Sequence, residues 1–186
     1  MEQFVIQGGQ PLNGTVTPSG NKNAALPLIA ATLLTDQPVI LRNLPRIRDV
    51  QTMMKLVADL GVIITEIDRH TVQFQATNLK KTELDRDLCR EIRASILLAG
   101  PLLARLKSVE LPPPGGDVIG RRRVDTHFLA FHKLGAEIHI DGEFRVAAER
   151  LIGTDILLDE ASVTGTENAI MAAVLAHGTT IFRNAA

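Results

Sequence analysis

The chain has no tryptophan and no tyrosine, and its 186 residues include only six phenylalanines and one cysteine. Apolar residues make up 45%, so the core must be built from Leu, Ile, Val and Ala, and the length allows one domain with a sizeable core. The single thiol, Cys89, excludes an internal disulfide and fits a reducing compartment. The formal net charge of −1 argues against general nucleic-acid binding, which depends on excess positive charge.

The chain also lacks the apolar segments that membrane insertion requires. The uncharged run from Asn23 to Thr35 has 13 residues, and a spanning helix needs roughly 20. Residues 1–7 show neither the basic region nor the apolar core of a signal peptide. The five histidines form no metal-binding pattern, and Gly-x-Gly-x-x-Gly and Walker motifs are missing. We therefore expect a soluble, cytoplasmic protein that binds no metal.

An internal repeat is the most informative pattern present. An amphipathic run over Asp49–Leu60 ends at Gly61, and a similar run ends at Gly135. Asp49 is a plausible N-cap of the first helix, and Gly61 suits the C′ position. Each helix is followed by a predicted hairpin: residues 62–67 with 71–75, and residues 136–140 with 143–147 across a two-residue Asp141-Gly142 turn.

A second helix type precedes these units. Residues 23–35, 93–105 and 168–177 are small-residue apolar stretches, and short β-like segments follow at residues 39–41, 108–111 and 180–182. Helices that are apolar on nearly every side are buried helices, so the sheets should lie outside them. The repeat unit is helix, strand, helix, strand, strand, and the third copy stops after its first strand. We infer a fragment, or a shortened relative, of a longer protein.

The N-terminal segment, residues 1–18, lies outside the repeat. Residues 4–7 and 14–17 read as two strands around a Gly8-Gly9 turn region. The predicted organisation is therefore a hairpin over residues 1–18, leading towards a second domain, and a repeat domain over residues 19–186 with a truncated third repeat.

Three loops at equivalent positions of the repeat carry candidate ligand-binding residues. Lys22 stands at the start of the first small-residue helix, Arg93 at the start of the second, and a Ser162 turn before the third. Helix N-termini attract anions. Each loop also has an ordinary explanation: capping by Asn21 or Asn23, charge compensation of Arg93 by Glu91, and a capping box of Ser162 with Glu167. Convergence of all three favours a polyanionic ligand.

Charged side chains, prolines and glycines are most concentrated in residues 112–127, which read PPPGGDVIGRRRVDTH. Prolines and glycines build an irregular loop there, and one carboxylate, Asp117, is followed by three arginines. The pattern indicates an anion-binding loop with a proton-handling group. A solvated charged loop is the alternative.

Four segments together resemble the UDP-N-acetylglucosamine 1-carboxyvinyltransferase family of enolpyruvyl transferases: residues 19–27 (SGNKNAALP), 93–96 (RASI), 114–120 (PGGDVIG) and 124–127 (VDTH). The resemblance covers the whole chain, as roughly the N-terminal half of a member. It implies an α/β fold, specifically an inside-out α/β barrel built from repeated units. It also implies transfer of the enolpyruvyl group of phosphoenolpyruvate to the 3-hydroxyl of UDP-N-acetylglucosamine in peptidoglycan synthesis, without metal or organic cofactor.

The resemblance also assigns roles to individual residues. Phosphoenolpyruvate would contact Lys22 and Asn23. Asp117 stands where most members carry a cysteine that donates a proton and that fosfomycin alkylates, so insensitivity to fosfomycin is expected. The UDP-sugar would be held by Arg93, Arg122, Arg123, Val124, Asp125, Thr126, Glu160, Ala161, Ser162 and Val163.

Two departures limit what the chain can do alone. Arg121 and Arg123 replace smaller or apolar residues, and their charge favours the anion of Asp117 over the acid. The general base and several phosphate-binding arginines would come from the missing C-terminal half, so this chain alone should be inactive. A non-catalytic UDP-sugar-binding fragment remains an alternative. The shikimate-pathway enolpyruvyl transferase is a weaker one, because the residue 21–23 turn and the Asp117 loop argue against it.

Overall fold

The computed structural model describes residues 3–116 and 123–186 of the chain. Two copies of the predicted unit follow each other, which confirms the repeat. The first consists of α1 (Lys22–Ala31) continued by η1 (Thr32–Leu34), β1 (Val39–Leu41), α2 (Arg48–Asp59), β2 (Ile63–Glu66) and β3 (Val72–Gln75). The second consists of η2 (Arg93–Leu98) continued by α4 (Ala99–Leu106), β4 (Ser108–Leu111), α5 (Asp125–Lys133), β5 (Glu137–Ile140) and β6 (Phe144–Ala147).

The two sheets share one strand order. The second hairpin strand is central in both, giving β1-β3-β2 and β4-β6-β5 with antiparallel pairs throughout. In the second hairpin Ile140 lies opposite Phe144, so three residues form the connection rather than the two predicted. Gly142 takes a φ of +69°, a conformation that glycine adopts without the steric cost other residues meet.

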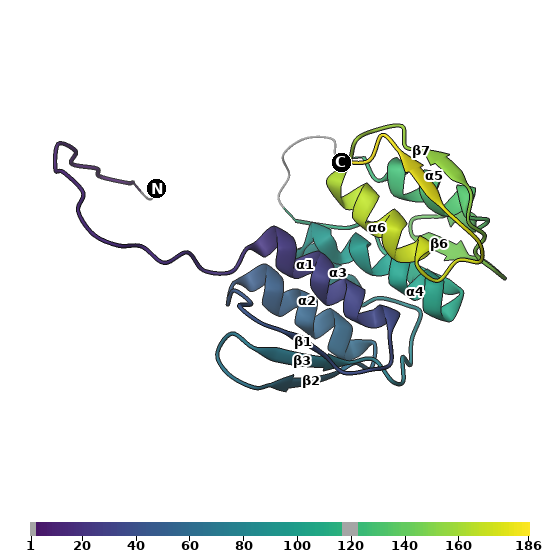
Figure 1. Cartoon of the computed structure of the whole chain (residues 1–186), viewed down its shortest axis with the longest axis horizontal. Coiled ribbons are helices and arrows are strands. Elements are labelled where there is room, and N and C mark those ends of the chain that lie inside the picture. Colours follow the sequence, from purple (N-terminus) through teal and green to yellow (C-terminus); the bar gives the residue numbers. More distant parts are fainter. Residues whose placement is uncertain (1–2, 117–122) are drawn as a thin grey trace.

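The small-residue helices lie inside and the sheets outside, as predicted. In Figure 1 the sheet β1-β3-β2 runs along the lower edge of the molecule, below α2 and α1. Helix α4 packs against α6 (Val163–Ala173), and α1 packs against η2. Alanines such as Ala30, Ala99 and Ala172 are fully buried at these contacts, because short side chains let helices approach closely. No helix in residues 3–116 or 123–186 is long and apolar enough to cross a membrane.

The third copy differs from the prediction in two ways. Helix α6 begins at Val163, earlier than predicted, because Ser162 caps it and accepts a hydrogen bond from the Gly165 amide at 3.2 Å. The strand after it, β8 (Ile181–Arg183), pairs in parallel with β7 (Asp155–Leu157), which the sequence pattern missed. The pattern also missed α3 (Arg86–Glu91), which precedes η2.

Residues 3–18 form no helix and no strand, so the hairpin predicted there is not seen in this structure. Figure 1 shows the segment leading away from the helices as an extended arm. Its apolar side chains are open to solvent; Phe4 is 97% and Leu12 99% exposed. A hairpin in this arm is therefore a proposal about a longer protein.

Side chains from one repeat complete helix ends in another. Arg105, near the end of α4, donates to the carbonyl oxygens of Leu33 at 2.9 Å and Ala76 at 3.2 Å in the first repeat. In the other direction, Asn168 of α6 accepts a hydrogen bond at 2.7 Å from the amide of Gly100, in the first turn of α4. The repeats are thus joined by polar contacts as well as by apolar packing.

Candidate functional site

A hollow of about 380 Å³ opens where α1, η2 and α6 begin, and we call it the helix-start cleft. Three loops far apart in the sequence meet there, as the repeat predicts. The structure brings Lys22, Asn23, Arg93 and Val163 together in its wall, and Gly116 lies beside them. The other residues that line the cleft are Leu26, Pro27, Asp49, Glu91, Ile92, Ala94, Ile96, Leu97, Thr164 and Glu167.

Lys22 forms an ion pair inside the cleft with Asp49, a carboxylate that the sequence analysis took for a helix cap. Asp49 is not the N-cap of α2; Ile47 is, and Asp49 lies in the first helical turn. Its Oδ2 is 3.0 Å from Lys22 Nζ. Because Lys22 begins α1, where the helix dipole disfavours a cation, this carboxylate offsets part of that cost. An anionic ligand would meet Lys22 with Asp49 already beside it.

The backbone amides at the start of α1 are partly used by capping. Asn21 is the N-cap, and its side-chain oxygen accepts from the amides of Asn23 at 2.7 Å and Ala24 at 3.2 Å. The first of the two explanations of this turn, capping by Asn21, is therefore confirmed. The second, ligand binding, stays a prediction. The positive charge offered to a ligand here comes from Lys22 and the helix dipole.

Arg93 lines the cleft, and one of its contacts joins two segments of the site. Its Nη2 donates to the Arg123 carbonyl oxygen at 2.9 Å, which connects η2 to the segment before α5. Glu91 accepts from Thr52 Oγ1 at 2.9 Å and lies 3.7 Å from Arg48, so these contacts are with α2. Compensation of Arg93 by Glu91 stays a prediction.

A further acid lines the cleft. Glu167, in the second turn of α6, is partly buried there, and this burial raises the pKa of its carboxyl group. The sequence analysis treated Glu167 only as part of a capping box. In the structure it adds a carboxyl group that is easier to protonate than a solvated one.

The segment 123–126 packs against the turn that begins α6. Val124 is the N-cap of α5, and Thr126 is 3% exposed. A Cβ on Gly165 would lie 3.0 Å from Thr126 Cγ2, so glycine allows the two helix starts to approach each other. Two predicted ligand-binding segments are therefore neighbours in space.

Asp159 holds this arrangement in place and was missed by the sequence analysis. Its Oδ1 accepts from Thr126 Oγ1 and its Oδ2 from Arg123 Nη2, both at 2.8 Å. The Thr126 hydroxyl, with the Arg123 charge, lowers the pKa of the Asp159 carboxyl. An acid shortly before a Ser N-cap was the available signal, but nothing local shows that its partners come from the start of α5, a distant part of the sequence.

The remaining residues predicted to bind ligands either lie next to the cleft or fall outside the residues that the structure describes. Glu160 and Ala161 are exposed on the turn before α6, next to the cleft but outside its lining. Asp125 accepts from Arg123 Nε at 2.8 Å. Asp117 and Arg122 lie outside the described residues.

Two glycines dock the start of the Asp117 loop against α3. Their amides donate to consecutive carbonyl oxygens, Gly115 to Cys89 at 3.0 Å and Gly116 to Arg90 at 3.1 Å. A Cβ on Gly115 would lie 1.9 Å from the Arg90 carbonyl oxygen. The absence of a side chain is therefore required for this contact.

Replacing Gly115 with alanine is expected to separate the loop base from α3. The Cβ cannot fit against a backbone oxygen at 1.9 Å, so both hydrogen bonds must lengthen or break. Amide hydrogen exchange should become at least tenfold faster at residues 115 and 116, as expected for roughly 1.4 kcal/mol of lost protection. Gly8→Ala is the control, because nothing lies within 4 Å of that position. Equal protection in both variants would contradict the docking.

Behind the cleft lies a buried polar cluster. Asn168 Nδ2 donates to the Ile96 carbonyl oxygen at 2.8 Å and lies 3.0 Å from His127 Nδ1. His127 is 2% exposed, and its burial, with the charge of Arg93, lowers its pKa to about 4. Asn168 thus links the neutral imidazole of His127 in α5 to Ile96 of η2, a residue that also lines the cleft.

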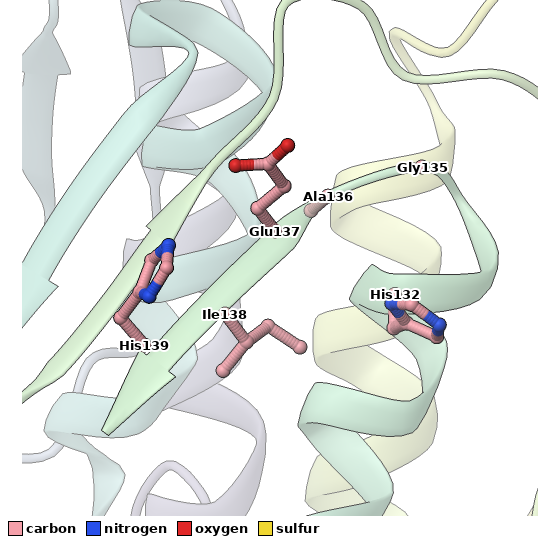
Figure 2. A pocket seen from close by; sticks show the side chains of 6 residues that line it. All are labelled: His132, Gly135, Ala136, Glu137, Ile138 and His139. Atoms are coloured by element: carbon pink, nitrogen blue, oxygen red, sulfur yellow. The ribbon is translucent and has the colours of Figure 1, made fainter.

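A second hollow, of about 450 Å³, lies between α5 and β5 and shares no residue with the cleft. Figure 2 shows Ile138 directed towards His132, while Glu137 and His139 lie apart from each other along the strand. Within the part of the chain that the structure describes, no three His, Cys, Asp or Glu side chains are grouped to hold a metal ion. The helix-start cleft is the better candidate site because it gathers predicted ligand-binding residues from three loops.

Comparison with known proteins shows the family to which the chain belongs. The family model described as EPSP synthase (3-phosphoshikimate 1-carboxyvinyltransferase) matches residues 6–186. The protein named UDP-N-acetylglucosamine 1-carboxyvinyltransferase is 56% identical over all of this chain in Treponema denticola, and 54% identical over 99% of it in Bradyrhizobium diazoefficiens. The chain spans 44% and 43% of those two proteins.

Solved structures show the same fold at lower identity. The enolpyruvyl transferase NikO from Streptomyces tendae superimposes with a TM-score of 0.78 over 95% of this chain and 42% of its own, at 24% identity. EPSP synthase from Acinetobacter baumannii gives a TM-score of 0.71 at 18% identity, covering 91% of this chain and 40% of its own. With its repeated α/β units and a family match that runs nearly from end to end, the chain belongs to the EPSP synthase family of carboxyvinyltransferases.

Proposed function

We propose that this chain is the N-terminal part of an enzyme that transfers the enolpyruvyl group of phosphoenolpyruvate to the 3-hydroxyl of UDP-N-acetylglucosamine. The main observation in support is the helix-start cleft, which brings Lys22, Asn23 and Arg93 together from two repeats. A phosphate bound there would face two cations and the positive ends of helices. The names of the relatives that are 45–56% identical support this choice of substrates.

The reaction is an addition followed by an elimination. The sugar 3-hydroxyl oxygen bonds to C2 of phosphoenolpyruvate, and C3 takes up a proton. Loss of that hydroxyl proton and of one proton at C3, with cleavage of the C2–O bond to phosphate, then restores the double bond. Lys22 and Arg93 would stabilise the phosphates and the charge that develops on the departing one.

The other roles follow the resemblance and remain part of the proposal. Asp117 would supply the proton to C3. The segment from Arg122 to Thr126 and the turn from Glu160 to Val163 would hold the nucleotide sugar. The base that accepts the hydroxyl proton would come from the downstream portion that the longer relatives contain.

The same proposal includes the finer architecture. Two sheets outside and three small-residue helices inside support an inside-out α/β barrel, completed by further units in a longer chain. The arm over residues 3–18 would form its hairpin against that second domain.

The shikimate-pathway activity is less well supported. The family model carries that name, but the relatives that are 54–56% identical are named UDP-N-acetylglucosamine 1-carboxyvinyltransferase, and the EPSP synthase structure is only 18% identical. For the isolated chain, a non-catalytic role in binding UDP-sugars is the alternative, since Arg93 and residues 123–126 are present without the proposed base.

The test is binding of both substrates to the 186-residue chain, followed by NMR. UDP-N-acetylglucosamine is expected to shift amides of residues 93–94, 123–126 and 160–165, and phosphoenolpyruvate those around Lys22. Lys22→Ala should weaken phosphoenolpyruvate binding roughly 10- to 100-fold, as loss of a charged hydrogen bond does.

Lys55→Ala is the control for the loss of one positive charge, since Lys55 does not line the cleft. Phosphate release from both substrates is expected only when the downstream portion is present. Equal effects of the two lysine variants would contradict the assignment of Lys22.

A further inference from the structure

Arg123 is a positively charged residue within the segment proposed to hold the UDP-sugar, but its guanidinium group already forms ion pairs with two carboxylates. Nε donates to Asp125 Oδ2 and Nη2 to Asp159 Oδ2, each at 2.8 Å. Two carboxylates thus surround the Arg123 guanidinium and offset its charge. This leaves Arg123 less able to attract a diphosphate.

Asp159 reaches both ends of the short segment. One of its oxygens accepts from Arg123 and the other from Thr126 Oγ1, at the first turn of α5. The Arg123 carbonyl oxygen is held by Arg93 Nη2 at 2.9 Å. Side-chain and backbone contacts therefore fix the segment from three directions.

We infer that Arg123 and Asp159 form a clamp that positions residues 123–126 for a uridine nucleotide, and that Arg123 does not itself bind the phosphates. Arg123 and Asp159 are positioning residues, which leaves the backbone of the segment and Arg93 to meet the nucleotide. This inference rests on the proposed function for the identity of the ligand. The clamp itself rests on the contacts of the ligand-free chain.

The exposure of the clamp makes it testable without loss of the fold. The side chains of Arg123 and Asp159 are 48% and 36% exposed, and ion pairs at such positions add little to global stability. Arg123→Gln and Asp159→Asn should therefore leave the thermal unfolding midpoint nearly unchanged. Their effects should be confined to the segment and to nucleotide binding.

The first measurement is amide hydrogen exchange of the ligand-free 186-residue chain. Arg123→Gln, Asp159→Asn and Thr126→Val should each make residues 124–127 exchange roughly 3- to 10-fold faster. Arg145→Gln is the matched control, because it breaks another exposed ion pair, to Glu110 at 3.0 Å in the second sheet. Unchanged exchange in the clamp variants would overturn the inference.

The second measurement is NMR titration of the same variants with UDP-N-acetylglucosamine. A clamp predicts that Arg123→Gln and Asp159→Asn each weaken binding roughly 3- to 10-fold, and that the double variant is no weaker than the worse single one. A phosphate-binding Arg123 predicts the opposite sign for Asp159→Asn, since removing a nearby negative charge would tighten binding. Tighter binding by Asp159→Asn, or additive losses in the double variant, would overturn the clamp.

The two measurements separate failure of the clamp from failure of the proposed function. If the wild-type chain does not bind UDP-N-acetylglucosamine, the proposed substrate is wrong, and exchange at residues 124–127 still decides whether the clamp exists. If binding occurs and the clamp variants match wild type, the clamp is wrong and the proposed function stands.

Discussion

Replacing Asn168 with leucine is expected to lower the free energy of unfolding by about 3 to 5 kcal/mol. The Asn168 side chain is fully buried, and it is the partner of two backbone groups, the Gly100 amide at 2.7 Å and the Ile96 carbonyl oxygen at 2.8 Å. Leucine removes both partners in a place that excludes water. Each backbone group left without a hydrogen bond costs about 1 to 3 kcal/mol, and the bulkier side chain adds strain between α4 and α6.

Urea unfolding monitored by circular dichroism measures this loss. Asn78→Leu is the matched control, because Asn78 is an exposed loop residue. Its unfolding curve should stay close to that of the wild type. Superimposable curves for both variants would show that Asn168 does not hold the helices together.

Lowering the pH from 7.5 to 4 is expected to remove about 3 kcal/mol of stability through His127 alone. The folded protein lowers the pKa of His127 to about 4 from the 6.5 of an unfolded histidine. Between these values the unfolded chain binds the proton more readily than the folded one. The His127 contribution is therefore complete above pH 6.5 and is lost as the pH falls towards 4.

His127→Gln isolates this contribution, because glutamine can hydrogen-bond to Asn168 and does not titrate. The variant should show a smaller loss of stability across the same window in urea unfolding at several pH values. Glu167 acts in the opposite direction, since its raised pKa lets the folded state gain a proton first as the pH falls, and it is common to both proteins. Equal slopes for wild type and His127→Gln would refute the neutral, buried imidazole.

The first two repeats were predictable because their signals are local. Alternating apolar residues specify each hairpin, and the second has a Gly-containing turn. Gly61 takes a φ of +104° just after α2, as its predicted C′ position requires. The strand β7 was not predictable in the same way. It is very short, and its parallel partner β8 follows only after the whole of α6. Helix α3 was missed because its charged residues show no apolar period.

The cleft was predictable from repeat equivalence, but its carboxylates were not. Lys22, Arg93 and Val163 stand at matching helix starts, so the repeat alone places them on one side. Asp49 and Asp159 are defined by partners in other elements, Lys22 of α1 and the Arg123–Thr126 segment, and no local pattern encodes such contacts. His127 looked like one of five scattered histidines, and only packing shows that it is buried beside Asn168.

Hydrogen bonds between repeats also constrain how the chain folds, because the ends of some helices find their partners only in another repeat. Arg105 and Asn168 reach partners in other repeats, so the ends of η1 and α4 remain unsatisfied until distant segments have arrived. In solenoids, each repeat contacts only its neighbours and can form in sequence. Here α6 of the third repeat also packs against α1 of the first, and closing such a long loop costs entropy before any contact is gained. Folding is therefore expected to be slow and cooperative across all three repeats, so a cut between them would unfold the rest.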